Sequence, residues 1–300
     1  MTNENILVIG SVSIDNVIYT DKLPIGGTTV FGTKFISNVG GKGANQAIAI
    51  SRLGGEVNYI GAIGNDEEGL RIERFLNEND LNSTLLKKKE STGIASITID
   101  NKTGENRIII IPGANLAISK KDIDNNILLF KKSSYLLMQL ETPVETVCYA
   151  LKLAKKLGIT TILNPAPYKP LPEDIFPYID YFIPNEHEID GYVLETIDDE
   201  IEKGKYMLTK GAKNVIITLS SRGALLVNKD KEILFNARKV KAIDTTAAGD
   251  SFVGAFVTEL SKDRPIEDAI EDAIKASSLT VTKQGAIQSL PTKEEVDKIK

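Results

Sequence analysis

The sequence has 300 residues, 42% of them hydrophobic, with 36 basic and 41 acidic residues and a net charge of −5; this content predicts one large folded unit rather than a disordered chain. The charges are intermixed without a basic block, which argues against nucleic acid as a partner. One cysteine, a start unlike a signal peptide and no run of 18 apolar residues predict a cytoplasmic protein without disulfides or membrane spans.

Short β-rich apolar runs alternate with helical patterns along the chain. The predicted strands are 5–9, 57–63, 134–138, 159–163, 179–183 and 214–219. Between them apolar residues recur at intervals of three and four, as at Ile48, Ile50 and Leu53. This alternation predicts a three-layer α/β/α fold with a mostly parallel central sheet, whose ligands bind at the carboxyl ends of the strands.

Two regions break the alternation. Residues 11–35 are polar and rich in glycine, and residues 93–111 read as a hairpin with its turn at 101–105. Strands without crossover helices predict a small separate sheet. We expect a lid, from about 11–35 and 93–114, inserted in a single domain of residues 1–300; ordinary edge hairpins are the alternative.

One helix has predicted boundaries. Thr142 reads as its cap, Pro143 as its first residue and Glu145 as the third residue after the cap. Gly158 lies where a left-handed residue would end the helix.

The glycine cluster Gly40-Gly41-Lys42-Gly43-Ala44-Asn45 precedes the helical run 46–53. Such a cluster lets backbone amides and an asparagine approach a hydroxylated ligand. It is not a Walker A loop, because glycine follows Lys42 and the spacing differs. A turn packed tightly against the sheet would explain the glycines equally well.

A second small-residue stretch, DTTAAGDSF, covers residues 244–252. If a helix begins near Ala248, the amides of residues 247–250 are its unpaired donors and can bind an oxyanion or phosphate. A carboxylate beside that anion, Asp250, would repel it unless the acid accepts a proton from a nucleophilic hydroxyl. The alternative is an ordinary first-turn acid that stabilises the helix dipole.

The chain resembles the ribokinases of the carbohydrate kinase family often called PfkB, over essentially all 300 residues. The motifs that carry the resemblance are, in chain order, GSVSID, VGGKGANQA, STGIA, IPGAN, LLMQLE, LNPAP, PNEHE, ITLSSRGA, DTTAAGDSF and TKQGAIQSLP. The resemblance implies a ribokinase-like fold and ATP-dependent phosphorylation of the 5-hydroxyl of D-ribose, which gives ribose 5-phosphate and ADP. It also implies a homodimer formed through the lid sheets.

The resemblance assigns roles at the reacting end. Asp250 is implied as the catalytic base, with the amides of Ala247, Ala248 and Gly249 as the anion hole for the transferred phosphate. These groups suit phosphoryl transfer, which depends mostly on positioning and charge stabilisation. The sugar contacts implied by the resemblance are Ser13, Asp15, Gly41, Lys42, Gly43, Asn45, Glu141 and Asp250.

The nucleotide and ion sites are also implied. Mg²⁺, bound with ATP, is implied at Asn185 and Glu188, whose oxygens suit a hard cation. The nucleotide-binding residues are implied to be Asn185, Thr218, Ser220, Ser221, Arg222, Gly223 and Gly249, with adenine beside the helical segment 266–281. K⁺ or another monovalent cation is implied at Asp244, Thr246, Thr280, Lys283, Gly285 and Ser289, mainly through backbone oxygens.

Two departures from the family pattern bear on the substrate and the nucleotide. Ser13 replaces the asparagine usual in ribokinases, so a 2-deoxyribose kinase is the main alternative. Ser220 replaces a usual glycine and can alter the backbone approach to the phosphates. A nucleoside kinase and a non-catalytic sugar sensor fit less well, and an oxidoreductase fails because no G-x-G-x-x-G follows the first strand.

Overall fold

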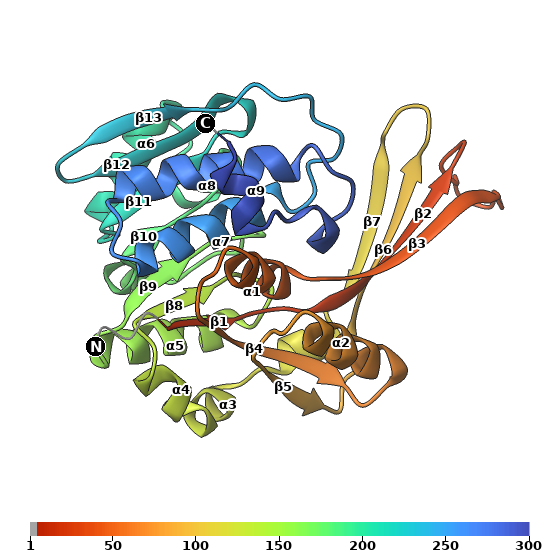
Figure 1. Cartoon of the computed structure of the whole chain (residues 1–300), viewed down its shortest axis with the longest axis horizontal. Helices are drawn as coiled ribbons and strands as arrows, with labels where there is room; N and C mark the ends of the chain where they lie inside the picture. The colour runs from red at the N-terminus through yellow and green to blue at the C-terminus, as the bar shows by residue number, and fades with distance from the viewer. Residues whose placement is uncertain (1–4, 300) are drawn as a thin grey trace.

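The chain folds around a nine-stranded sheet, and a computed structural model describes residues 5–299 (Figure 1). The strands of this sheet are β1 (Ile6–Ile9), β4 (Val57–Gly64), β5 (Ser83–Lys88), β8 (Tyr135–Met138), β9 (Thr160–Leu163), β10 (Tyr181–Phe182), β11 (Asn214–Thr218), β12 (Gly223–Asn228) and β13 (Glu232–Asn236). Their spatial order is β13-β12-β11-β10-β9-β8-β1-β4-β5. Neighbours from β11 to β5 are parallel, whereas β12 and β13 pair antiparallel at one edge.

The side chains of β1 alternate between two hydrophobic cores. Ile6 and Val8 pack in one core, and Leu7 and Ile9 pack in the other. All four side chains are fully buried. Successive side chains of a strand point to opposite faces, so this strand needs helices on both sides.

Helices cover both faces of the sheet. The core of Ile6 and Val8 includes residues of α1 (Lys42–Arg52), α2 (Glu67–Glu78), α7 (Ala248–Ser261), α8 (Ile266–Thr280) and α9 (Lys293–Asp297). The core of Leu7 and Ile9 includes residues of α3 (Lys120–Asn125), α4 (Ile127–Lys131), α5 (Val144–Lys156) and α6 (Glu200–Thr209). The predicted three-layer α/β/α fold with a mostly parallel sheet is confirmed.

A second, four-stranded sheet projects from the main body (Figure 1). Its strands are β2 (Ser13–Thr20), β3 (Gly32–Gly40), β6 (Gly93–Asp100) and β7 (Asn106–Ile111), in the order β3-β2-β6-β7. The predicted small sheet and its turn at 101–105 are confirmed, although β3 runs to Gly40, beyond the predicted segment 11–35. The parallel pairing of β2 with β6 was not predicted, because these strands are far apart in sequence.

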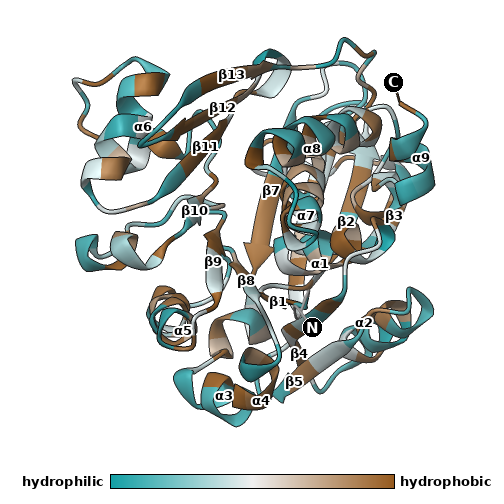
Figure 2. Cartoon of the chain, turned by 60° about the vertical axis from the view of Figure 1, so that its left-hand side comes forward, coloured by the Kyte–Doolittle hydropathy of each residue, from teal (hydrophilic) through white to brown (hydrophobic). Residues whose placement is uncertain are grey.

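The edge strand of this sheet exposes an apolar surface. Residues Ile108 to Ile111 of β7 are 53–68% exposed, and Phe35 of β3 is 63% exposed. In Figure 2 the part of β7 that is in view is coloured hydrophobic, as expected for its four isoleucines. A row of apolar side chains on an open strand edge is a surface that folded proteins usually cover.

Two predicted helix starts differ from the structure. Helix α5 begins at Val144 with Pro143 as its cap residue, and no side chain makes a capping hydrogen bond there. The predicted Thr142 cap is therefore wrong. Thr142 is fully buried instead, and its hydroxyl has no hydrogen-bond partner in the described residues. Gly158 does follow the helix in a left-handed conformation, with φ of 76°, as predicted. Helix α1 begins at Lys42, inside the glycine cluster rather than after it.

A search of residues 5–299 finds no helix that combines the length and the apolar character needed to span a membrane.

Candidate active site

The predicted site residues gather at the carboxyl ends of the parallel strands. Asp15 lies near the start of β2, the strand that comes after β1. Glu141 follows β8, and Asn185 follows β10 and bridges in parallel to Thr218 at the end of β11. This is the sheet edge where open α/β sheets bind ligands. The first turns of α1 and α7 close over the same edge, since Asn45 of α1 and Asp250 of α7 are hydrogen-bonded.

The glycines at the start of α1 allow two backbone segments to touch. A Cβ on Gly43 would lie 2.5 Å from the carbonyl carbon of Gly10, and Gly41 has a φ of 93° that favours glycine. The first turn of α1 therefore lies against the backbone that leaves β1. The tight packing predicted for this cluster is confirmed, and it brings the backbone N–H of Lys42 to 3.1 Å from Oε2 of Glu141. Binding of a hydroxylated ligand by these amides stays a prediction.

Three carboxylates surround the sugar side of the site. The hydroxyl of Ser13 donates to Oδ1 of Asp15 at 2.8 Å, and the hydroxyl of Ser11 donates to Oε2 of Glu141. Burial raises the pKa of Asp15, against the hydrogen bond from Ser13, and the charges of Glu141 and Asp250 raise it further. The site is therefore rich in hydrogen-bond acceptors.

Lys42 supplies positive charge beside these carboxylates. Burial alone would lower the pKa of its ammonium, but the neighbouring carboxylates, led by Asp250 and Glu141, raise it overall. The lysine therefore remains charged at neutral pH and can face an anion.

Asp250 lies in the first turn of α7 and is 7% exposed. Its Oδ2 accepts from Nδ2 of Asn45 at 2.8 Å, and its Oδ1 accepts from Nε2 of Gln46 at 2.9 Å. Both donors come from α1, which packs against α7. The carboxylate is thus held at a defined position rather than left free to rotate.

The N-terminus of α7 has open amides. The N–H of Ala248 donates to the carbonyl of Thr245 at 3.2 Å, whereas in the described chain the N–H groups of Ala247 and Gly249 have no acceptor. No atom lies within 4 Å of a Cβ built on Gly249, so space is open in front of this turn. Unpaired amides at a helix start attract anions.

Asn185 and Glu188 form a local turn. The N–H of Asn185 donates to Oε2 of Glu188 at 2.9 Å, and the N–H of Glu188 donates to Oδ1 of Asn185 at 2.7 Å. Burial raises the pKa of Glu188, which the N–H of Asn185 and the charge of Lys42 offset only in part. A carboxylate in this environment gains from a nearby cation.

A cavity of about 210 Å³ joins Lys42, Glu188 and Asp250, whereas Asp15, Asn45 and Glu141 do not line it. Its lining comes from both the sugar side and the nucleotide side of the predicted site: Lys42, Asn164, Ala166, Ile183, Asn185, Glu188, Thr218, Thr245, Ala247, Gly249, Asp250 and Val253. Residues from α1, the strand ends and α7 therefore face one shared space. A ligand in it would contact Asp250 and the start of α7 together.

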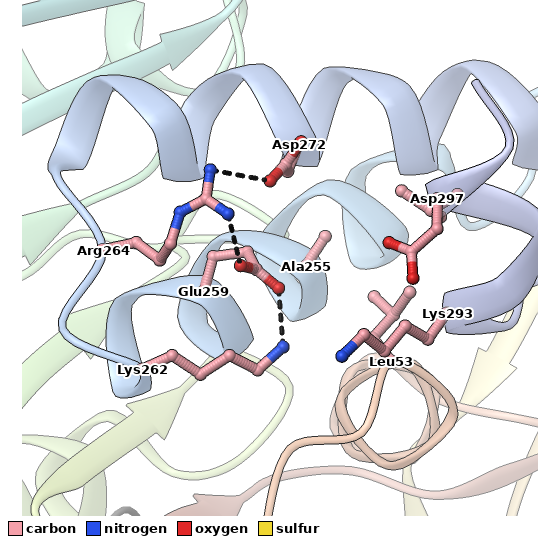
Figure 3. A pocket seen from close by; sticks show the side chains of 9 residues that line it. Leu53, Ala255, Glu259, Lys262, Arg264, Asp272, Lys293 and Asp297 are labelled. Atoms are coloured by element: carbon pink, nitrogen blue, oxygen red, sulfur yellow. Dashed lines mark hydrogen bonds and ion pairs between the residues drawn. The ribbon is translucent and has the colours of Figure 1, made fainter. Parts of the chain in front are cut away.

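A larger hollow of about 330 Å³ lies between α7, α8, α9 and the end of α1 (Figure 3). Two ion pairs lie along it: Lys262 lies 2.7 Å from Glu259, and Arg264 lies 3.4 Å from Asp272. None of the site residues predicted from sequence lines it. Because Asp250 and the start of α7 line the smaller cavity instead, we assign the candidate active site to that cavity.

The predicted nucleotide segment is a tight turn after β11. Ser220 has a φ of 52°, and its hydroxyl donates to Oε1 of Glu186 at 2.8 Å. Arg222 donates to Glu186 and to Glu200, each at 2.7 Å. Hydrogen bonds from Arg222 and Ser220 lower the pKa of Glu186. Neither acid was predicted, since the PNEHE motif that contains Glu186 has implied roles only for Asn185 and Glu188, and Glu200 lies in none of the motifs.

The rest of this turn is constrained by its backbone. Ser221 lies between Ser220 and Arg222 in a short 3-10 turn, and Gly223 begins β12 with a φ of 109°. A Cβ on Gly223 would collide with the carbonyl oxygen of Phe235. Glycine is therefore required at position 223 both by the backbone conformation and by the closeness of β13.

The structure also brings the predicted monovalent-cation residues together. The N–H of Gly285 donates to Oδ2 of Asp244 at 2.9 Å, and the N–H and hydroxyl of Thr246 donate to Oδ1. Burial alone would raise the pKa of Asp244, but these hydrogen bonds lower it overall. Thr280 ends α8, and its hydroxyl donates to Ser251 next to Asp250.

Two members of that set make other bonds. The ammonium of Lys283 pairs with Glu295 at 2.6 Å, and the hydroxyl of Ser289 donates to the carbonyl of Ala286 at 2.7 Å. Their backbone oxygens are the atoms left for an ion.

Known proteins resemble this chain along nearly its whole length. Residues 3–293 match the family model described as pfkB family carbohydrate kinase. The ribokinase of Schizosaccharomyces pombe is 40% identical over 98% of this chain and 96% of its own length, and the deoxyribokinase of Salmonella typhi is 35% identical over 97% of both. The solved structure of Arabidopsis thaliana ribokinase complexed with ribose and ATP superposes with a TM-score of 0.90 at 29% identity, covering 98% of this chain and 97% of that one.

The resemblance inferred from the motifs is thus confirmed along nearly the whole chain, and so is a phosphotransferase acting on an alcohol group. On both the sequence match and the arrangement around Asp250, this chain belongs to the pfkB family of carbohydrate kinases.

Proposed function

We propose that this protein is an ATP-dependent kinase that phosphorylates the 5-hydroxyl of D-ribose, giving ribose 5-phosphate and ADP. The observation that carries the proposal is the single cavity in which Asp250, the start of α7 and Lys42 face Asn185 and Thr218. Full-length similarity to a ribokinase, and to a structure solved with ribose and ATP, supports the same substrates.

In this proposal the sugar lies against the three carboxylates. Asp15, Asn45 and Glu141 would accept from and donate to its hydroxyls, and the backbones of Gly41 and Gly43 would let it approach closely. Lys42 balances the negative charge. Asp250 takes the proton of the 5-hydroxyl as that oxygen bonds to the γ-phosphorus and the bond to ADP breaks.

The amides at the start of α7 are proposed to stabilise the transferred phosphoryl group. Gly249 and Ala247 have N–H groups without acceptors in the described residues, and Ala248 lies between them. Pre-oriented donors in a site closed to water are worth more than in solution. The N-terminus of α7 would therefore provide part of the charge stabilisation that arginine or lysine side chains provide at other phosphoryl-transfer sites.

Mg²⁺ is proposed to be held at Asn185 and Glu188, where it would neutralise the charge of the phosphate groups. The fit rests on the donor set, since both residues carry hard oxygen atoms and both line the cavity. Mg²⁺ commonly uses one or two carboxylates together with water and substrate phosphates, so a small donor set is sufficient.

ATP is proposed to lie along Thr218, Ser220, Ser221, Arg222 and Gly223, with adenine near α8. Ser220 does not obstruct the backbone here, because its hydroxyl is turned to Glu186. A monovalent cation such as K⁺ is proposed between Asp244, Thr246 and the segment from Thr280 to Ser289, where backbone carbonyls and a carboxylate are available.

The four-stranded sheet is proposed to act as a lid inserted in one α/β domain, and as the contact surface of a homodimer. The exposed isoleucines of β7 support a second copy of the chain as the partner, because the same apolar row on both copies can cover itself. A small-molecule enzyme of this kind would act in the cytoplasm.

A second candidate substrate is 2-deoxyribose. Its support is the hydroxyl of Ser13, whose proton is already donated to Asp15, together with 35% identity to a deoxyribokinase. A sugar that lacks one hydroxyl loses the least binding free energy where no buried group of the protein is left without a hydrogen-bond partner.

The test is a coupled ADP-release assay with Mg²⁺ and K⁺ that compares kcat/KM for ribose, 2-deoxyribose, fructose and adenosine. A ribose preference of about tenfold or more, about 1.4 kcal/mol of transition-state preference, supports the ribose assignment. Equal or better use of 2-deoxyribose would replace it, and activity with adenosine alone would overturn it.

A further inference from the structure

The carboxylate of Asp250 is held by two amides that differ in their surroundings. Asn45 donates to Oδ2, and its own carbonyl oxygen is buried without a partner in the described chain. Gln46 donates to Oδ1 and is fully buried, with every polar atom of its side chain engaged. Asn45 can therefore exchange partners when a ligand binds, whereas Gln46 cannot.

The orientation of the Gln46 amide is fixed by its neighbours. Its Nε2 donates to Oδ1 of Asp250 at 2.9 Å and to Oδ1 of Asn164 at 3.0 Å, and its Oε1 accepts from Nε2 of Gln139 at 2.6 Å. Turning the amide over would place its carbonyl oxygen against a carboxylate and another carbonyl oxygen. That arrangement pairs acceptors with acceptors, so one orientation is strongly favoured.

This chain of amides ends in the central sheet. Asn164 directly follows β9, and its Nδ2 donates to the carbonyl of Ile183, just past β10, at 2.8 Å. Gln139 directly follows β8 and is 1% exposed. Hydrogen bonds through Gln46 thus connect Oδ1 of Asp250 to the ends of three adjacent parallel strands, β8, β9 and β10.

We propose that Gln46 is a positioning residue of the phosphoryl transfer. It holds Oδ1 of Asp250 and so leaves Oδ2, on the side of Asn45, as the oxygen that receives the substrate proton. Gln46 does not line the cavity and acts through Asp250. The inference rests on the proposed function, because it assigns a role in the reaction that Asp250 is proposed to catalyse.

The test compares Gln46→Met with the wild-type protein. Methionine has a similar length and flexibility but donates no hydrogen bond. Loss of the donor frees the carboxylate to rotate, and small misplacements of a reacting group cost up to about 10²-fold, so we expect kcat to fall by roughly 10- to 100-fold. KM for ATP should stay within about threefold, since no nucleotide contact is removed.

Two further variants separate positioning from folding. Gln139→Met removes the donor that anchors Gln46 and should lower kcat in the same direction but less. Thr258→Val removes a fully buried hydrogen bond of α7, from the Thr258 hydroxyl to the carbonyl of Gly254 at 2.8 Å, and should leave kcat unchanged. An equal loss in Thr258→Val would assign the effect to helix packing and overturn the proposal.

The decisive measurement is a double-mutant cycle with Asp250→Asn. If Gln46 acts only through Asp250, adding Gln46→Met to Asp250→Asn should lower kcat by less than about threefold. Fully additive losses would overturn the proposal. Normal kcat in Gln46→Met would refute this inference alone, whereas a wild-type protein without sugar kinase activity would overturn the proposed function and this role with it.

Discussion

Replacing Asp250 by asparagine should separate catalysis from stability. The substitution keeps the shape of a side chain that is 7% exposed and removes its charge. Its Oδ1 can still accept from Gln46, whose amide is fixed. The new amide nitrogen then faces Asn45. If the side-chain amide of Asn45 turns over, its own carbonyl oxygen, which lacks a partner in the described residues, can accept from that nitrogen.

This exchange of partners sets the expected magnitudes. One hydrogen bond replaces another, so the free energy of unfolding should change by less than about 1 kcal/mol, the usual net contribution of one such bond. Loss of a general base costs at least about 10²-fold in kcat, which corresponds to about 2.7 kcal/mol of transition-state stabilisation. Catalysis should therefore lose several times more free energy than folding does.

The assay pairs ADP release at saturating ribose and ATP with thermal unfolding and calorimetric titration of Mg-ATP. We expect near-normal ATP affinity and a melting temperature within about 3 °C of the wild type. A kcat close to that of the wild-type protein would refute the assignment of Asp250 as the base. A large loss of stability together with lost ATP binding would refute the partner exchange with Asn45.

Three other outcomes follow from the same structure. Burial raises the pKa of Asp15 and Glu188, so the folded protein binds more protons than the unfolded chain, and stability falls as pH rises above the ordinary pKa of these groups. Mg-ATP should therefore raise the melting temperature more at pH 7.5 than at pH 5. An equal rise at both pH values would contradict the placement of Mg²⁺ at Glu188. Ser220→Gly should relieve a left-handed conformation but lose the bond to Glu186, so stability should change by less than about 1 kcal/mol and KM for ATP by less than about threefold; a tenfold rise in KM would instead show that the serine hydroxyl contacts the nucleotide. Ile109→Lys should convert a dimer to a monomer in light scattering after gel filtration, and a monomeric wild-type protein would contradict the dimer.

The fold was largely predictable because its strands are short apolar runs bounded by helical patterns. Each predicted strand of the main sheet exists, and their ends shift by no more than two residues. Thr142 misled the prediction because a threonine followed by proline fits a helix cap equally well in sequence, and only the structure shows Pro143 in the cap position. The antiparallel edge strand β13 was missed because its residues, EILFN, alternate only briefly.

The candidate site was predicted where a motif keeps its members close in sequence. Asp250 and the α7 amides come from one stretch of nine residues, and the structure leaves them in one cavity. Gln46 was missed although it adjoins Asn45, because its partners Gln139 and Asn164 are 93 and 118 residues away. A buried glutamine gives no periodic or compositional signal, so its role depends on contacts that only the fold creates.

The alternation of β1 also has a consequence for how the protein unfolds. Four consecutive side chains supply both hydrophobic cores, and the strand lies inside the sheet between β4 and β8. If either helical layer detached, half the side chains of β1 would lose their packing and that face of the sheet would be exposed to water. The two layers should therefore melt together in one cooperative transition, and the active site, which is built from α1, α7 and the strand ends, should be lost at the same step.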